Sequence, residues 1–575
     1  MQRPVDARRP QVPRPTAGSK SAITPHVERL ATGQMSMSWL GDDVTVAQQP
    51  IPNRRQFLST AALVTAAVGT AGSVGGGIAS AVPSSPRTRF RPDGMSVSEL
   101  AIALQARRVT SVDLVRAYQE RIAAYDQQGP KLNAIITNNV AAIHDASRLD
   151  DERRRGYVRG PLHGIPIIVK DNFDTADLPT TAGSRLLARS VPAHDSTVVS
   201  QLRAAGAIVL AKSNMSEWAI FISTDSSRAG QTRNPHDLAH NPGGSSGGTG
   251  AAVAADFGAV GIGSDTSGSI RIPSAHNSLY GLRPTKGLVS TGGVIPLSAT
   301  QDTAGPIGRS VSDLAIVLDV IAGHFDRRDP STRRAVGKRP PSYLQALSER
   351  ALRGARLGVA RSMFSGPTTP GGDPGVLAVM DSVLRRLRAS GAVLVEVPEL
   401  DETEALAADV LLFEACEDID SYLKKLPSRP VAGIDAVLAS NTAVAYAESR
   451  LLAARATGGR VDPLYGAALK QRRKLFNKII GIMDRRRLTA IVHPTVQVQP
   501  PRIPEERIDA ALTADIAPCS GLPALSVPGG LSRDGLPVGF DLLGRPFTEQ
   551  TLMNLAYSFE REHNPRVSPR YTPPL

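Results

Sequence analysis

Cysteine and clustered histidine, the side chains that most often bind zinc, are sparse in this 575-residue chain. It has two cysteines, Cys416 and Cys519, and ten dispersed histidines without an HExxH motif. Because zinc sites need Cys and His ligands at short, recurring spacings, the sequence predicts no metal site. Two distant cysteines permit one disulfide bond but do not predict it.

Long runs of positive charge are also absent. The chain carries 66 Lys and Arg against 53 Asp and Glu, a net charge of +13, and its arginines lie scattered along helical patterns. Residues 82–575 hold 58 of the basic and 49 of the acidic side chains. Nucleic-acid-binding domains instead gather basic residues on one face or stripe. We therefore expect no nucleic-acid partner.

The most apolar stretch, NRRQFLSTAALVTAAVGTAGSVGGGIASAV, is a poor membrane span because it is rich in Gly and poor in Leu and Ile. Its paired Arg54 and Arg55, the apolar stretch after them and the small residues Ala79–Ala81 resemble a twin-arginine export signal. We predict a signal peptide at residues 51–81 and an exported protein, periplasmic or extracellular; a short membrane anchor is the alternative.

Residues 1–50 are rich in Pro, Arg, Ser and Gln and show no apolar period, which predicts a disordered N-terminal extension. This extension is long for an export signal. Met35 and Met37 are therefore alternative translation starts to Met1.

Residues 87–575 alternate short apolar runs with helical patterns. IPIIVKD and AVGIGSD are typical of buried strands, ending at Lys170 and Asp265, while STVVSQLRAAG and GGTGAAVAADFG are typical of helices. This alternation predicts one large α/β domain with a mixed, mostly parallel β-sheet covered by helices on both faces. Residues 401–487 are expected to be mainly helical.

The glycine-rich stretch HNPGGSSGGTG is compatible with several kinds of loop. A phosphate-binding P-loop needs a lysine where Thr249 stands, and GAVGIGSDT lacks the third glycine of a dinucleotide fingerprint. GGSSG formally matches a nucleophile elbow with Ser245 as the nucleophile. An elbow must follow a strand, however, and TRNPHDLAHNP is not typical of one.

A second stretch, GSDTSGSIRIPSA, does follow an apolar run and places serines between small residues. Backbone N–H groups in such a turn can converge on an oxyanion. A serine there stays inert without a base, and no histidine lies near it in the sequence. Lys170, at the end of a buried strand, is the remaining candidate.

These motifs together resemble one family. GPLHGIPIIVKDN, GGSSGG and GSDTSGSIRIP, followed by GLRPTKGLVS, QDTAGPIGRSVSD and SGLPALSVPGG, are similar in order and spacing to the amidase signature family over roughly residues 95–565. The resemblance implies a hydrolase of carboxamide C–N bonds that needs no cofactor.

The resemblance also implies a Ser–Ser–Lys triad. Ser269 would be the nucleophile, Ser245 the bridging serine on a cis peptide bond, and Lys170 a base kept neutral by burial. The oxyanion hole would use the backbone N–H groups of Thr266, Ser267, Gly268 and Ser269.

Three further residues are candidates for supporting the triad. Ser246 either joins its hydrogen-bond network or only shapes the turn, and Asp265 and Arg271 are expected to brace the second motif as an ion pair. Ser267 departs from the pattern, since many family members have glycine there; the departure keeps the backbone donor and adds a hydroxyl.

Within the family, NMSEWA, AGQTRNP and QDTAGP are most similar to bacterial peptide amidases, which remove the C-terminal amide of peptides. Small aliphatic or aryl amides are alternative substrates. A second interpretation is the glutamine-acting subunit of a tRNA-dependent amidotransferase; an export signal argues against it, because charged tRNA is cytoplasmic. A third is a silent binding protein. The acyl and amine specificity and the oligomeric state are left open.

Overall fold

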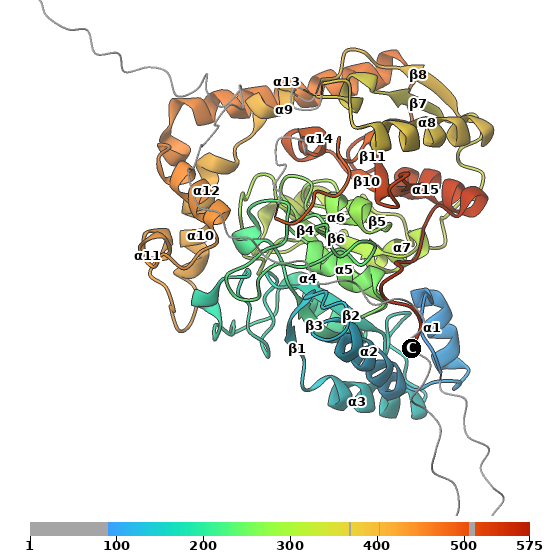
Figure 1. The fold of residues 1–575 in the computed structure, drawn as a ribbon, viewed down its shortest axis with the longest axis vertical. Helices are drawn as coiled ribbons and strands as arrows, with labels where there is room; N and C mark the ends of the chain where they lie inside the picture. The colour runs from blue at the N-terminus through green and yellow to red at the C-terminus, as the bar shows by residue number, and fades with distance from the viewer. Residues whose placement is uncertain (1–89, 367–369, 402, 505–511) are drawn as a thin grey trace, which may run out of the picture. The chain divides into compact units, whose positions relative to one another are not determined.

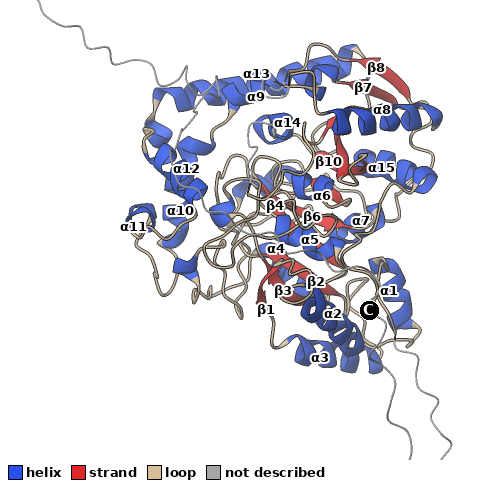
Figure 2. Cartoon of the chain, in the orientation of Figure 1, coloured by secondary structure: helices blue, strands red, loops and turns tan. Residues whose placement is uncertain are grey.

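The apolar runs assigned to strands lie in one 11-stranded sheet of the computed structural model, which describes residues 90–575 except 367–369, 402 and 505–511 (Figures 1 and 2). The described residues belong to a single unit, Thr88–Leu575. The predicted N-terminal extension and signal peptide lie outside the described residues.

The strands run in the spatial order β1-β3-β2-β4-β6-β5-β10-β11-β9-β7-β8. Their bounds are β1 (Ile135–Asn138), β2 (Pro166–Lys170), β3 (Ile208–Ser213), β4 (Val260–Asp265), β5 (Tyr280–Arg283), β6 (Thr303–Gly308), β7 (Arg356–Val359), β8 (Val393–Glu396), β9 (Ala490–Pro494), β10 (Ala524–Leu531) and β11 (Pro537–Leu543).

The sheet is mixed, as predicted, but it is not mostly parallel. Parallel pairing joins β2 to β3 and β4, and β7 to β8 and β9. The other six neighbouring pairs in the described sheet are antiparallel. The expectation failed because β1, β5 and β6 were not identified; β5 and β6 (YGLR and TAGPIG) are short and carry Gly or Pro, which weakens a strand signal.

Helices cover both faces of the sheet, since strands such as β2, β3 and β4 are buried at every position. Among the helices that contact strands are α2 (Ser111–Tyr125), α3 (Ala142–Arg154), α5 (Gly247–Ala254), α6 (Arg271–His276), α7 (Val311–Ile321), α8 (Pro374–Ala389) and α15 (Glu549–His563). The remaining α-helices outside the middle segment are α1 (Val97–Gln105), α4 (Thr197–Ala204) and α14 (Leu512–Ser520).

The predicted helical middle segment is present. It comprises α9 (Thr403–Ala408), α10 (Leu411–Leu423), α11 (Ile434–Ala439), α12 (Ala445–Arg455) and α13 (Pro463–Arg485), drawn in orange tones in Figure 1. Cys416 in α10 and Cys519 in α14 are both buried and free, and they pack in separate apolar clusters.

Two helices begin with a capping box. Ser96 with Glu99 and Thr110 with Asp113 form reciprocal capping boxes at α1 and α2. None of the helices in the described part of the chain has the length and apolarity needed to cross a membrane.

Candidate active site

Lys170 ends β2 and is completely buried. Its Nζ lies 2.8 Å from Ser245 Oγ and 2.9 Å from Ser264 Oγ. Burial lowers the pKa of the Lys170 ammonium from 10.5 to about 7, while the negative charges of Asp265 and Asp302 oppose this shift. A large share of Lys170 side chains is therefore neutral at neutral pH.

The neighbours of Lys170 orient this amine. Asn172 Nδ2 donates a hydrogen bond to Ser264 Oγ at 3.0 Å, so Ser264 accepts from both Asn172 and Lys170. A neutral amine keeps one lone pair, and the Ser245 hydroxyl at 2.8 Å is placed to donate to it. Ser264 and Asn172 were not singled out in the sequence, although both lie inside the quoted motifs.

The loop that carries Ser245 begins α5 at Gly247, and the Gly244–Ser245 peptide is cis. Ser246 links this loop to the second motif: its backbone N–H donates to the Ser269 carbonyl at 3.2 Å, and its Oγ donates to the Ser264 carbonyl at 3.2 Å. Ser245 and Ser246 are completely buried. The two serine motifs therefore form one hydrogen-bonded unit.

Ser269 lies in the turn that follows β4 and is buried, with 4% of its surface exposed. The predicted set of oxyanion donors needs one correction. The Gly268 N–H donates to Asp265 Oδ1 at 2.9 Å, so this amide is already engaged. The N–H groups of Thr266, Ser267 and Ser269 have no acceptor among the described residues and keep the assignment.

Asp265 braces this turn as expected, through an ion pair with Arg271 in which Nε and Oδ2 are 3.1 Å apart. Arg271 also binds Asp541 of β11 at 2.6 Å, and Arg283 of β5 binds Asp265 Oδ1 at 2.8 Å. All four side chains are completely buried. The positive charges of Arg271 and Arg283 hold the pKa of Asp265 below its usual range, against the effect of burial. The turn is thus fixed to two other strands of the sheet, β5 and β11.

Asp302 and Gln301 also hold the turn, although neither was predicted as a site residue from the sequence. Asp302 accepts a hydrogen bond from Thr266 Oγ1 at 2.5 Å, and Gln301 Nε2 donates to the Thr266 carbonyl at 3.2 Å. Gln301 Oε1 in turn accepts from the Val410 N–H and from Arg472 of α13, both at 3.0 Å. In the sequence, only their place in the QDTAGP motif pointed to Gln301 and Asp302. The contacts of Gln301 with Val410 and Arg472 link the turn to the helical middle segment.

Ser267, the departure from the family pattern, lies beside Asp515 of α14, and its hydroxyl opposes the effect of burial on the pKa of the Asp515 carboxyl. Burial raises the pKa of the Asp515 carboxyl to about 8, and the negative charge of Asp409 adds to that rise. The additional hydroxyl of this turn therefore faces a carboxyl group that is largely protonated at neutral pH.

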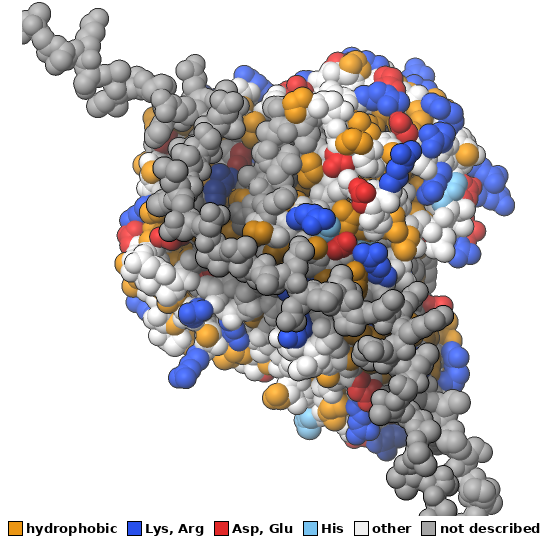
Figure 3. All heavy atoms as spheres, viewed as in Figure 1, with side chains coloured by type: hydrophobic (Ala, Val, Ile, Leu, Met, Phe, Trp, Pro, Cys, Tyr) orange, Lys and Arg blue, Asp and Glu red, His pale blue; other side chains and the backbone are white. Residues whose placement is uncertain are grey.

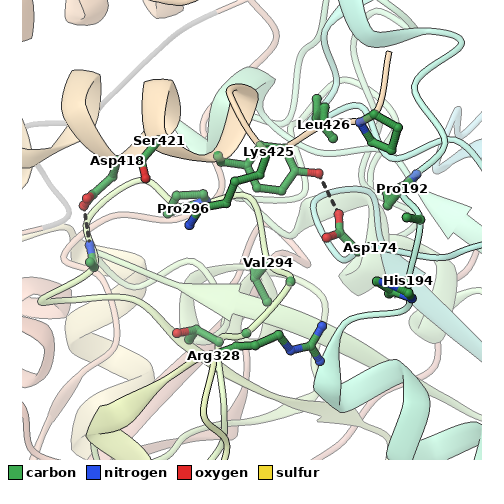
Figure 4. A pocket seen from close by; sticks show the side chains of 17 residues that line it. Asp174, Pro192, His194, Val294, Pro296, Arg328, Asp418, Ser421, Lys425 and Leu426 are labelled. Atoms are coloured by element: carbon green, nitrogen blue, oxygen red, sulfur yellow. Dashed lines mark hydrogen bonds between the residues drawn. The ribbon is translucent and has the colours of Figure 1, made fainter. Parts of the chain in front are cut away.

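A separate cavity of about 510 Å³ lies between the Thr291–Pro296 segment and α10 (Figure 4). Asp174 and Tyr422 both line it, and the Tyr422 hydroxyl donates to Asp174 Oδ1 at 2.6 Å. None of Lys170, Ser245 and Ser269 lines this cavity. It is therefore distinct from the serine–lysine unit.

Surface charge is mixed on the face shown in Figure 3, where Lys and Arg gather most densely at the upper right, over α8, with Asp and Glu among them. The described residues contain no group of three or more His, Cys, Asp or Glu side chains arranged to hold a metal ion.

Comparison with known proteins identifies the class of this α/β fold with its serine–lysine site. The family model for Amidase matches residues 113–553. A glutamyl-tRNA(Gln) amidotransferase subunit of Moorella thermoacetica is 36% identical over 485 residues, covering 81% of this chain and 96% of that protein.

Solved structures of peptide amidases share the fold of this chain. The native peptide amidase from Stenotrophomonas maltophilia superposes with a TM-score of 0.74 and 37% identity, covering 84% of this chain and 99% of that one. The peptide amidase PAM in complex with the competitive inhibitor chymostatin gives a TM-score of 0.76 and 37% identity, covering 84% of this chain and 100% of that one. The chain belongs to the amidase family and is an amidase-signature hydrolase of C–N bonds.

Proposed function

We propose that this protein is an exported amidase that hydrolyses the C-terminal carboxamide of peptides through Ser269, Ser245 and Lys170. The observation that carries the proposal is the 2.8 Å contact between Lys170 Nζ and Ser245 Oγ, because burial there brings the pKa of the lysine to about 7. A base with a pKa near the working pH is the most effective at taking a proton.

In the proposed reaction, Ser269 Oγ forms a bond to the amide carbon and its proton passes to Ser245 Oγ. Ser245 passes its own proton to Lys170 Nζ. The N–H groups of Thr266, Ser267 and Ser269 stabilise the developing oxyanion. The C–N bond then breaks, the proton returns through Ser245 to the departing nitrogen, and water hydrolyses the acyl ester on Ser269 by the same route.

The triad is tested by labelling with a fluorophosphonate, a reagent that reacts with activated serines, followed by intact-mass and peptide analysis. We expect one label, on Ser269 of the wild type, lost in Ser269→Ala and strongly slowed in Ser245→Ala and Lys170→Ala. A label on Ser245 that persists in Ser269→Ala would contradict this assignment and favour the nucleophile elbow.

The substrate class is tested by ammonia release. The support for peptides is the 37% identity to peptide amidases, one of which is described in complex with chymostatin. We expect C-terminally amidated peptides to be cleaved faster than small aliphatic or aryl amides, with competitive inhibition by chymostatin. Faster cleavage of aryl amides, without inhibition, would overturn the peptide assignment.

A second candidate function is that of the glutamine-acting subunit of an amidotransferase, which is favoured by the similarity to the Moorella thermoacetica protein over 81% of this chain. Such a protein acts on glutamine to supply ammonia. Ammonia release from free glutamine exceeding that from amidated peptides would favour this candidate. We expect the reverse, with more ammonia released from amidated peptides than from free glutamine.

Export is supported by the paired Arg54 and Arg55 before an apolar stretch and by the small residues Ala79–Ala81. We expect the mature protein outside the cytoplasm, with an N-terminus close to residue 82. Arg54→Lys with Arg55→Lys is expected to retain it inside the cell. Unchanged export of that double variant, or an unprocessed N-terminus, would contradict a twin-arginine signal.

A further inference from the structure

The segment from Ser216 to Thr224 packs against the Ser245 loop in an unusual backbone conformation. Four of its non-glycine residues have positive φ: Trp218 at 57°, Ala219 at 60°, Phe221 at 76° and Thr224 at 59°. For a β-branched residue such as Thr224 this left-handed conformation is a genuine outlier. Such outliers persist only where surrounding contacts enforce them, and they cluster at functional sites.

The Thr224 hydroxyl brackets the loop that carries the bridging serine. Its Oγ1 donates to the Gly243 carbonyl at 2.7 Å and accepts from the Gly247 N–H at 3.0 Å. The residues between these two anchors are Gly244, Ser245 and Ser246. Thr224 is completely buried, so no water competes for these two hydrogen bonds.

The backbone of the same segment reaches Ser245 directly. The Thr224 N–H donates to Ser216 Oγ at 2.9 Å, and the Ser216 N–H donates to the Ser245 carbonyl at 3.1 Å. Gly244 and Gly247 lie beside these contacts, and neither position has room for a larger side chain. A Cβ at Gly247 would lie 2.2 Å from Thr224 Oγ1, and one at Gly244 would lie 2.7 Å from Ser216 Oγ.

From these contacts we propose that Thr224 is a positioning residue for the bridging serine: its hydroxyl holds both ends of the turn, so that Ser245 Oγ stays at 2.8 Å from Lys170 Nζ. The inference rests on the proposed serine–lysine reaction. Thr224 itself exchanges no proton with the substrate; it acts only through Ser245.

Thr232 provides a matched control. It is a completely buried threonine whose hydroxyl also makes two hydrogen bonds, donating to the Asn133 carbonyl at 2.7 Å and accepting from Asn214 Nδ2 at 2.9 Å. Neither partner belongs to the Ser245 loop. Replacing either threonine by valine removes a buried hydroxyl while keeping the β-branched shape.

The experiment compares Thr224→Val, Thr224→Ser and Thr232→Val in the full chain. The measurements are the rate of fluorophosphonate labelling of Ser269 and kcat and KM for an amidated peptide. We expect Thr224→Val to lose about 10- to 100-fold in kcat and in labelling rate with KM changed by less than about threefold. Thr224→Ser, which keeps the hydroxyl, is expected to stay within about threefold of wild type, as is Thr232→Val.

A double-mutant cycle separates positioning from general loosening. In the Ser245→Ala background the hydroxyl has no bridging serine to place, so adding Thr224→Val is expected to cost less than about twofold further. If Thr224→Val does not fold, Ser216→Ala replaces it; that variant keeps Thr224 but removes the acceptor of its N–H, and about a threefold to tenfold loss of kcat is expected.

Equal losses in Thr224→Val and Thr232→Val, full additivity with Ser245→Ala, or wild-type rates in Thr224→Val or Ser216→Ala would each overturn the proposal. Failure of the underlying reaction is distinguishable from these results. In that case the wild type itself would show no label on Ser269 and no amide hydrolysis.

Discussion

Two lysines, Lys170 and Lys212, lie on adjacent parallel strands, and both are completely buried. Burial lowers the pKa of each. In the sheet Lys212 pairs with Val169 rather than with Lys170, so the two side chains leave opposite faces. Lys170 meets the hydroxyls of Ser245 and Ser264, whereas Lys212 is surrounded largely by acceptors.

The partners of Lys212 favour its ammonium form and oppose the effect of burial. Its Nζ donates to the carbonyls of Phe173 and Pro179 at 2.8 and 3.2 Å and lies 3.7 Å from Asp171 Oδ1. It also donates to the hydroxyls of Thr180 and Thr175 at 3.0 and 3.2 Å, and both hydroxyls give their own protons to backbone carbonyls. Carbonyl and carboxylate oxygens accept hydrogen bonds only, and they stabilise the ammonium form. Burial alone therefore does not make a base; a base also needs a neighbour that gives it a proton.

The largest expected effect tests this contrast. Lys170→Met removes the basic nitrogen while keeping an unbranched side chain that is one atom shorter, so kcat/KM for an amidated peptide is expected to fall about 10²- to 10⁴-fold. Circular dichroism and thermal melting check that the variant is folded. Activity above a tenth of wild type would show that Lys170 is not the base.

The matched variant Lys212→Met is expected to act on stability. It leaves Asp171 buried without its cation, so the free energy of unfolding should fall by about 3–5 kcal/mol in a denaturant titration. The kcat of the folded fraction should remain near wild type. Adding Asp171→Asn to Lys212→Met should restore part of the stability. If Lys212→Met lost as much kcat as Lys170→Met, the two lysines would not differ in role.

The pH dependence sharpens the comparison further. Lys170 must be neutral to act as a base, and its pKa is about 7, so activity should rise with pH through 7 and level off above it. Below that value kcat/KM should fall about tenfold per pH unit. Folded Lys212→Met should show the same fall of kcat/KM below pH 7. If this fall shifted to another pH in Lys212→Met, the titrating group would be Lys212 rather than Lys170.

Ser246→Ala should give the smallest effect. Its hydroxyl donates only to the Ser264 carbonyl in the described structure, beside but not within the Lys170–Ser245 contact. We expect about 1 kcal/mol less stability and less than about a threefold change in kcat, measured by melting and ammonia release. A loss approaching that of Lys170→Met would make Ser246 part of the proton path.

Much of the architecture was predictable from local pattern. The strand ends at Lys170 and Asp265, both capping boxes and the helical middle segment follow from apolar periodicity and cap residues. The antiparallel strands β5 and β6 were missed because their Gly- and Pro-bearing sequences carry little local strand signal. Their pairing with neighbouring strands stabilises them, and that contact is long-range.

The site was predictable only in part, for the same reason. The motifs that carry Lys170, Ser245 and Ser269 are visible in the sequence, and their resemblance to a family implied their roles. Asp302 and Gln301, which hold Thr266, lie 36 and 35 residues away from it. The engagement of the Gly268 amide by Asp265 depends on how the turn closes, which no residue pattern specifies.

The sequence by itself determined the family, the order of the main elements and the three residues of the proposed triad. The resemblance to the family singled out Lys170, but the strand pattern did not explain why Lys170 rather than Lys212 serves as the base, since IIVKDN and VLAKSN are both typical of buried strands that end near a lysine. Only the tertiary structure decided that question. Register sends consecutive side chains to opposite faces. Packing then places serine hydroxyls around Lys170, and around Lys212 it places carbonyls, a carboxylate and two threonine hydroxyls that donate their protons elsewhere.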